Sequence, residues 1–359
     1  MSIDAYLYCA SGHDRKADLA ATEIGALGDD ELLWINVEGC DGEDAVRIGE
    51  LLGIDPELLS RLCGPHPARH LDNFGDHYAF AVETPRRQRK RGAGDARDAG
   101  QGETGQSDAE EITQDAIGGL DLGDDSEAPK SAQLGFVVGK RWLVTVHTEP
   151  VEFLQGFRKQ DKGETRIGSL SPSLLVASLL DWHLSEFLHA VSVIERDADR
   201  LDEKILADGT RSGVLGDVVA LRRRVSQLRL MIARQRPVFH GLSRPDFALN
   251  ADERAAGHFA TLADRFDRAV DEVERSRDVA LGSFDLFTSM TTQQTNELVK
   301  ALTFLTALIG ACAAVAGLLG MNFEMPFFKT GAIGFIGVTI GMVVASGVAM
   351  FWARHRRWI

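Results

Sequence analysis

The sequence predicts an α/β domain followed by very long helices, the last of which enter and cross a membrane. Runs rich in β-branched and aromatic residues occur in the first 150 positions, and from Ser171 onward long helical patterns replace them. Two uncharged apolar runs, Ala301 to Leu319 and Gly331 to Trp352, follow toward the C-terminal end. These observations predict a cytoplasmic α/β domain, a long-helix stalk and two C-terminal transmembrane helices.

The predicted α/β domain covers residues 1–160. Helical spacing at Glu43 to Leu52 and at Pro56 to Leu62 lies between β-rich runs, and Gly139 with Lys140 provides the turn between the last two runs. The five β-rich runs are Ala5 to Ala10, Leu32 to Val37, His77 to Val82, Gln133 to Val138 and Arg141 to His147. The mixture of the two patterns indicates an α/β or α+β domain.

An acidic segment, residues 91–130, interrupts this domain. It contains eleven acids and three bases, a net charge of −8. Such a composition buries too little apolar surface to offset the entropy of ordering the chain, which predicts a disordered insertion between strands. The segment either concentrates cations or is an expanded surface loop, and the second interpretation is favoured.

Charge and cysteine content exclude several classes of protein. The formal net charge of −14 argues against nucleic acid as a partner and favours cations. Cysteines at 9, 40, 63 and 312 are scattered, so no disulfide framework is expected. The first ten residues contain Asp4 and no uncharged apolar run, which predicts that the N-terminus stays in the cytosol.

Motifs of the common enzyme classes are absent from the sequence. His183, Glu186 and His189 are spaced by three residues, not in the HExxH arrangement of metalloproteases, and we expect them to be solvated. No Walker loop, GxSxG elbow or CxxC pair occurs. The sequence therefore predicts neither an enzyme nor a bound cofactor.

Three long helical patterns follow the α/β domain. Helices are expected at Ser171 to Asp208 and from Val214 to about Phe239, forming a helical hairpin over residues 171–245 with a loop from Gly241 to Pro245. The third helix is expected to begin at Ala251 and continue to residue 320, a length of roughly 105 Å. A helix of that length is reasonable for a stalk, residues 251–300, that continues into a bilayer.

The two apolar runs have the length of membrane spans. About 20 apolar residues cross a bilayer, which predicts spans at 301–320 and 331–352, an external loop at 321–330 and a basic tail at 353–359. Arg354, His355, Arg356 and Arg357 follow the second span directly, so both chain ends are predicted to be cytoplasmic at the inner or plasma membrane. Because two helices cannot enclose an aqueous path, transport would require a homo-oligomer.

The first span ends in Gly320, Met321 and Asn322, and this GMN tripeptide between two C-terminal spans resembles the signature of the CorA magnesium transporter family. Upstream, Thr295 to Glu297 followed by Val299, Lys300, Leu302 and Thr303 is similar to the family's junction of stalk and pore. Weaker similarity covers Leu33 to Gly39, Asp72 to Thr84 and Phe136 to Pro150. The resemblance thus extends over nearly the whole chain outside the acidic insertion.

The resemblance implies a funnel-shaped homopentamer whose first spans line the pore and whose ligands are divalent cations. It makes Gly320, Met321 and Asn322 the selectivity filter, with Asn322 accepting hydrogen bonds from the hydration shell of the ion. Asn322 could also serve only as a helix C-cap, and Asn296 is either a second amide ring or an ordinary stalk residue. The implied pore-lining residues, which share one helix face, are Asn296, Val299, Leu302, Thr306, Gly310, Ala313 and Gly317.

Several positions depart from the family's pattern. Gly310 and Ala313 are small, which places a hydrophobic gate nearer Val299 and Leu302. The family usually has a metal-binding regulatory aspartate at the position of Thr261. Asp264 and Asp267 are therefore the candidate regulatory metal ligands of this chain.

The predicted function is channel-like transport of Mg²⁺ and Co²⁺ through a homopentameric pore. Two alternatives stay open: a Zn²⁺ or Ni²⁺ transporter of the same architecture, and a non-conducting membrane-anchored regulator or scaffold.

Overall fold

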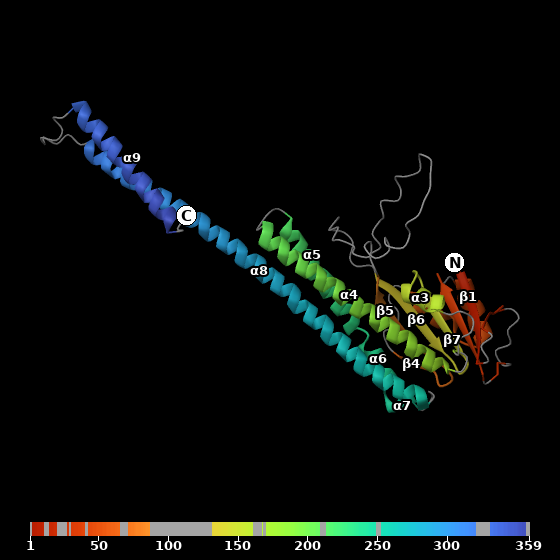
Figure 1. Ribbon diagram of the computed structural model, residues 1–359. Helices are drawn as coiled ribbons and strands as arrows, with labels where there is room; N and C mark the ends of the chain where they lie inside the picture. Colours follow the sequence, from red (N-terminus) through yellow and green to blue (C-terminus); the bar gives the residue numbers. More distant parts are fainter. Residues whose placement is uncertain are drawn as a thin grey trace, which may run out of the picture. The chain divides into compact units, whose positions relative to one another are not determined.

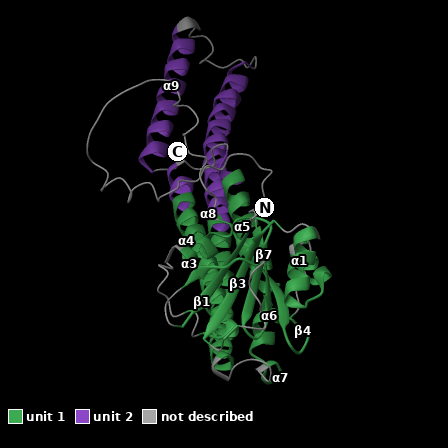
Figure 2. Ribbon diagram, turned by 90° about the vertical axis from the view of Figure 1, so that its right-hand side faces the viewer, with its two compact units in different colours: residues 1–201, 216–283 green, residues 202–215, 284–359 purple. Residues whose placement is uncertain are grey.

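The computed structural model of the protein describes residues 2–10, 14–19, 27–28, 30–39, 42–64, 71–86, 131–160, 167, 170–208, 213–248, 253–320 and 331–356. The predicted insertion 91–130 and the predicted external loop, with Met321 and Asn322, lie outside these residues. The described chain forms two compact units. The first comprises residues 1–201 and 216–283, and the second comprises residues 202–215 and 284–359 (Figure 2).

Seven strands of the first unit form one mixed sheet in the order β2-β1-β3-β7-β6-β5-β4. Figure 1 shows this sheet near the N-terminus. Its strands are β1 (Ser2–Cys9), β2 (Arg15–Lys16), β3 (Glu31–Glu38), β4 (Asp72–Asn73), β5 (Tyr78–Pro85), β6 (Ser131–Val138) and β7 (Trp142–His147). β3 and β7 pair in parallel, and the other neighbours pair antiparallel. The five long strands lie at the predicted β-rich runs, whereas β2 and β4 are too short to carry a periodic pattern.

Two short helices, α1 (Gly42–Leu52) and α2 (Pro56–Cys63), cover one face of the sheet. Their apolar residues, including Ile48 and Leu59, pack against alternate residues of β3 and β7. The approach of α2 to β6 is close, because a Cβ atom on Gly135 would lie 2.8 Å from Leu62 Cβ. A side chain at residue 135 would therefore displace α2.

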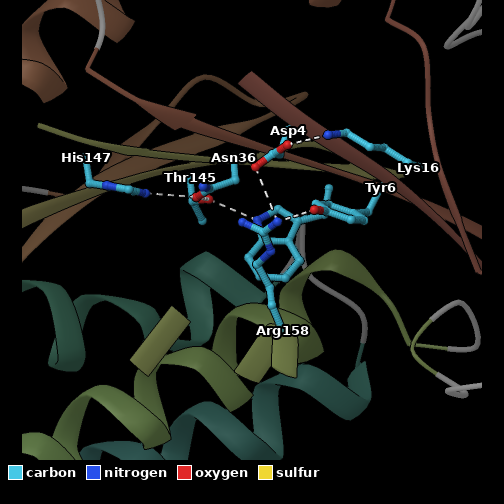
Figure 3. A network of polar contacts seen from close by, with 8 residues as sticks. Asp4, Tyr6, Lys16, Asn36, Thr145, His147 and Arg158 are labelled. Atoms are coloured by element: carbon cyan, nitrogen blue, oxygen red, sulfur yellow. Dashed lines mark hydrogen bonds and ion pairs between the residues drawn. The ribbon is translucent and has the colours of Figure 1, made fainter. Parts of the chain in front are cut away.

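The opposite face of the sheet carries a polar network beneath α3 (Glu152–Gln160), a helix that the sequence did not predict (Figure 3). Arg158 on α3 donates to Tyr6 and, over 3.3 Å, to Asp4, both on β1, which lies between β2 and β3. A second, buried group lies nearby, in which the hydroxyl of Thr145 donates to Asn36 Oδ1 over 2.8 Å. These bonds fasten α3 to β1 and satisfy polar groups within the sheet.

The helical hairpin consists of α4 (Pro172–Asp208) and α5 (Val214–Ala233), followed by α6 (Arg236–Leu242) and α7 (Pro245–Ala248). The predicted continuous helix from Val214 to Phe239 is wrong, because the chain breaks at Arg234 and Gln235. Pro237 has no backbone N–H to donate and cannot continue α5. The side chain of Gln235 turns inward and donates to the carbonyl oxygen of Glu83 on β5 over 2.6 Å.

The expectation that His183 is solvated is also wrong. His183 on α4 is fully buried, with its Nε2 2.7 Å from Gln235 Oε1, and its ring stacks near Phe239. Burial lowers the pKa of His183 to about 4, and the hydrogen bond with Gln235 opposes this only in part. His183 is therefore neutral in the folded protein at neutral pH.

Because the folded-state pKa of His183 lies below the ordinary value of 6.5, the unfolded chain binds a proton first as the pH falls. Stability linked to His183 is present above pH 6.5 and is lost toward pH 4, amounting to about 3 kcal/mol. Thermal unfolding of wild type and of His183→Gln across this range should show a steeper pH dependence for wild type. Parallel pH profiles would contradict the assignment.

The remaining helices are α8 (Glu253–Leu319) and α9 (Gly331–His355). α8 has 67 residues, which corresponds to about 100 Å. Among the described residues, three helices are long and apolar enough to cross a membrane, and these lie within α4, α8 and α9. Half of the apolar window of α4 is buried in the protein, whereas the windows of α8 and α9 are not buried at all. α4 is therefore a core helix, and α8 and α9 have the surfaces expected in lipid.

Candidate functional site

The membrane-compatible part of α8 and the helix α9 lie side by side in the second unit (Figures 1 and 2). Cys312 Sγ on α8 lies 3.6 Å from Ser346 Oγ on α9. The half-buried residues of α8 in this region share one face, and they are Ala301, Phe304, Leu308, Cys312 and Leu319. The contact residues of α9 are likewise spaced by three or four positions, and they are Gly334, Val338, Met342, Ser346, Ala349 and Ala353.

The predicted pore stripe lies on the opposite face of α8. Val299, Leu302, Thr306, Gly310 and Gly317 each precede a half-buried residue by two positions, which is about 200° around an α-helix. All seven predicted pore-lining residues, from Asn296 to Gly317, are exposed. The structure thus places the seven residues on one continuous face that α9 leaves uncovered.

The stripe changes in character along α8. Val299 and Leu302 are large, apolar and 54% and 64% exposed. Farther along, a Cβ atom added to Gly310 or Gly317 would meet no other atom within 4 Å, so that part of the stripe is open. The hydroxyl of Thr306 donates to the carbonyl oxygen of Leu302 over 2.8 Å. Its oxygen lone pairs remain available to accept hydrogen bonds.

A shallow polar groove of about 720 Å³, open to solvent, runs along α8 and overlaps the beginning of the stripe at Asn296. Its lining is made of hydroxyl, amide and charged side chains, namely Asp285, Thr288, Ser289, Thr292, Gln293, Asn296, Glu297 and Lys300. The hydroxyls of Thr288 and Thr292 donate to the carbonyls four residues earlier, which leaves their oxygens as acceptors. Oxygen acceptors and carboxylates are the groups that suit a hydrated divalent cation.

Among the residues of this groove, Asn296 was predicted from the sequence to line the pore. The signal for the others is the spacing of Asp285, Thr288, Thr292 and Asn296, which continues the stripe in steps of three and four residues. The groove therefore extends the candidate site toward the N-terminal part of α8.

Of the predicted filter, only Gly320 belongs to the described residues. Its N–H donates to the carbonyl oxygens of Ala316 and Gly317 over 3.0 and 3.2 Å, which closes the C-terminal end of α8. The roles of Met321 and Asn322 stay predictions from the sequence.

The two predicted regulatory acids lie one turn apart on α8 but differ in environment. Asp264 is exposed, whereas Asp267 Oδ1 lies 3.2 Å from His240 Nε2 and 3.5 Å from Arg236 Nη2. Within the described ranges, no group of three or more His, Cys, Asp or Glu side chains is placed to hold a metal ion. A metal at Asp264 would need ligands from another molecule.

Removing the Asp264 carboxylate should therefore change metal-dependent behaviour little. We expect wild type and Asp264→Ala to show the same small protection from proteolysis by Mg²⁺, because Thr261 supplies no carboxylate and Asp267 is engaged with Arg236 and His240. Asp199→Ala, which removes an exposed helical carboxylate from α4, serves as a matched control. Strong Mg²⁺ protection of wild type that disappears only in Asp264→Ala would establish a regulatory site there.

Comparison with known proteins adds independent observations. Residues 116–355 match the family described as CorA-like Mg2+ transporter protein. The cobalt/magnesium transport protein CorA of Thermotoga maritima is 23% identical over 329 residues, which is 91% of this chain and 83% of that protein. The zinc transport protein ZntB of Yersinia enterocolitica is 24% identical over 188 residues, 52% of this chain and 54% of that protein.

Among solved structures, the CorA magnesium transporter from Methanocaldococcus jannaschii is similar over 100% of both chains, with a TM-score of 0.72 and 18% identity. At this level of identity the similarity concerns the fold. It extends through the sheet, the long helix and the apolar C-terminal helices.

Proposed function

The chain belongs to the CorA-like Mg²⁺ transporter family, and on this premise we propose that five copies surround one path through the cell membrane and conduct Mg²⁺ and Co²⁺ along it. Family membership assigns the chain to divalent-cation transport through a CorA-type channel rather than to catalysis. The number of five copies follows from the resemblance of residues 320–322 and 295–303 to the family's pattern.

The exposed stripe opposite α9 is the observation that carries this proposal. The apolar windows of α8 and α9 are unburied in a single chain, and lipid suits the large side chains of α9, such as Ile333 and Phe351. The stripe from Asn296 to Gly317 instead combines an amide, a hydroxyl and glycines with two large apolar residues. That composition suits a narrow aqueous path with one hydrophobic constriction.

The cation would pass with most of its hydration shell. No Asp or Glu occurs between Glu297 and Glu324, so the path holds no carboxylate ring to replace water, and Mg²⁺ gives up water reluctantly. Asp285 and the hydroxyls of the polar groove would gather cations at one end of the path. Asn296 and Asn322 would form the inner and outer amide rings.

The membrane arrangement that we propose has two spans and both termini in the cytoplasm. Arg354 and Arg356 follow the apolar part of α9, and the Arg356 guanidinium carbon lies 5.4 Å from the centroid of the Trp352 ring. Trp is common at both membrane interfaces, and Arg residues directly after a span are typical of the cytoplasmic side.

Transport of Zn²⁺ or Ni²⁺ is the second candidate function. It is favoured by the similarity to the zinc transport protein ZntB and by the small residues Gly310 and Ala313 on the stripe. A wider path would discriminate less between hydrated ions of similar charge.

Reconstitution into liposomes loaded with metal-sensitive dyes tests these assignments. We expect uptake of Mg²⁺ and Co²⁺ above that of protein-free liposomes, without added nucleotide. Uptake of Zn²⁺ and Ni²⁺ in preference to Mg²⁺ would favour the second candidate. Absence of uptake of all four ions, by protein of normal oligomer size, would favour the membrane-anchored regulator or scaffold.

A further inference from the structure

The part of α8 that belongs to the first unit carries an exposed row of charges with alternating sign. These residues are spaced by three or four positions and therefore share one face. The row, named the charge ladder here, consists of Asp264, Arg268, Asp271, Arg275 and Asp278. Its acids recur every seven residues, and so do its arginines.

The charge ladder points away from its own chain. Phe266 and Val273, which are fully buried, each precede a ladder arginine by two positions, or about 200° around the helix. α8 thus has an apolar face packed within the first unit and a charged face directed outward.

Charges beside the ladder find partners within the chain. Arg265 Nη1 lies 2.5 Å from Asp181 Oδ1 on α4, and Glu274 accepts from Arg229 on α5. Asp267 faces Arg236 and His240. These pairs fix α8 against the hairpin and neutralise the flanks of the ladder.

The ladder residues differ from these flanking charges. Within the part of the chain that the structure describes, the side chains of Asp264, Arg268 and Asp271 form no hydrogen bond or ion pair. Arg275 and Asp278 contact Glu272 and Arg277 of the same helix, at solvent-exposed positions. Alternating charges on an outward face, without partners on other elements, are complementary to a second copy of the same face.

We propose that the charge ladder is a contact between parallel copies of this chain, in which Arg268 and Arg275 of one copy pair with Asp264, Asp271 and Asp278 of its neighbours. Three residues rise about 4.5 Å along a helix and four rise about 6 Å, which an arginine side chain can span. A seven-residue repeat is also the period with which parallel helices associate. The inference rests on the proposed function, because that function requires several copies.

In this contact, the guanidinium groups neutralise carboxylates of neighbouring copies that would otherwise repel one another. Each ladder has three carboxylates and two guanidiniums, a net charge of −1 per copy. Such an assembly does not need Mg²⁺ to hold these acids together. It should instead weaken at high salt, because exposed ion pairs are screened.

The oligomer mass of the full-length protein in detergent, measured by native mass spectrometry, tests the inference. Wild type should stay oligomeric in EDTA at low salt. Arg268→Gln/Arg275→Gln leaves three carboxylates per copy without counter-charges, so its oligomeric fraction in EDTA should fall several-fold and recover in millimolar Mg²⁺. Arg222→Gln/Arg223→Gln, which removes the same charge from the exposed side of α5, should behave as wild type.

Exchanging two charges of the ladder distinguishes a loss of ion pairs between copies from a failure of the variant to fold. Arg268→Asp alone should dissociate in EDTA, and Arg268→Asp/Asp271→Arg should regain most of the wild-type oligomer, with unchanged circular dichroism throughout. An Arg268→Gln/Arg275→Gln variant that assembles like wild type in EDTA would overturn the ladder while leaving the multi-copy pore intact. A wild type that is monomeric in every condition would overturn both.

Discussion

Replacing Asn322 with alanine is expected to lower divalent-cation uptake into proteoliposomes to the level of protein-free liposomes. Each amide in the proposed outer ring exchanges hydrogen bonds with the hydration shell of the ion, and one such bond is worth about 1 kcal/mol. Five copies would together lose about 5 kcal/mol, which corresponds to a decrease of more than roughly a thousandfold. Membrane insertion and oligomer mass should not change.

The matched control is Asn73→Ala, the same substitution on the exposed strand β4, where the Asn73 side chain accepts a hydrogen bond from the backbone of Gly75 over 2.9 Å. Its uptake should equal that of wild type. Normal transport by Asn322→Ala would remove Asn322 from the filter and leave the helix C-cap as its role.

Replacing Leu302 with serine is expected to raise cation flux in the absence of any stimulus. Leu302 is 64% exposed on the face of α8 opposite α9, next to Val299, and a ring of such residues closes a path by excluding water. Each copy would lose about 60 Å² of apolar surface, which lowers the cost of wetting by about 1.5 kcal/mol per copy. Basal flux should therefore rise by at least roughly tenfold.

Leu305→Ser is the matched control, because Leu305 is an exposed leucine of the same helix that lies outside the stripe. This variant should conduct like wild type if Leu305 faces lipid. Increased flux in Leu305→Ser but not in Leu302→Ser would place the conducting face elsewhere on α8. Single-channel recording in planar bilayers distinguishes a wetter pore from a larger number of inserted channels.

The two substitutions also distinguish a channel from a scaffold of the same fold. A scaffold would leave Asn322→Ala without a measurable loss, because there would be no flux to lose. Leu302→Ser could still open a path through it. If the Leu302→Ser variant conducts and the wild-type protein does not, the wild-type protein forms the assembly but its gate stays closed.

Much of the secondary structure could be predicted because its signals are local. The five long strands appear as runs of β-branched and aromatic residues, and α4, α8 and α9 appear as long patterns without proline in their interiors. The stripe from Asn296 to Gly317 follows from helix geometry alone, once its helix is recognised. Its three- and four-residue spacing survives in the structure as an exposed face.

Other features could not be predicted because they depend on residues that are distant in sequence. Pro237 prevents α5 from continuing, but the break also places Gln235 so that its side chain donates a hydrogen bond to the carbonyl oxygen of Glu83, which is 152 residues away. His183 belongs to the same contact, and neither its neighbours nor its spacing reveals that it is buried. The polar groove was missed because Thr and Ser on a helix face carry little signal without knowledge of exposure.

Composition and periodicity suffice to predict the α/β beginning, the long helices, the two apolar runs and the residues that share the stripe, because both are properties of neighbouring positions. The folded chain was needed for the strand order with its parallel β3–β7 pair, the engagement of Asp267 with Arg236 and His240, and the face of α8 that α9 leaves open. Charge neutralisation and burial depend on which distant side chains meet. A carboxylate read as a metal ligand along the chain can already have a cation beside it in space.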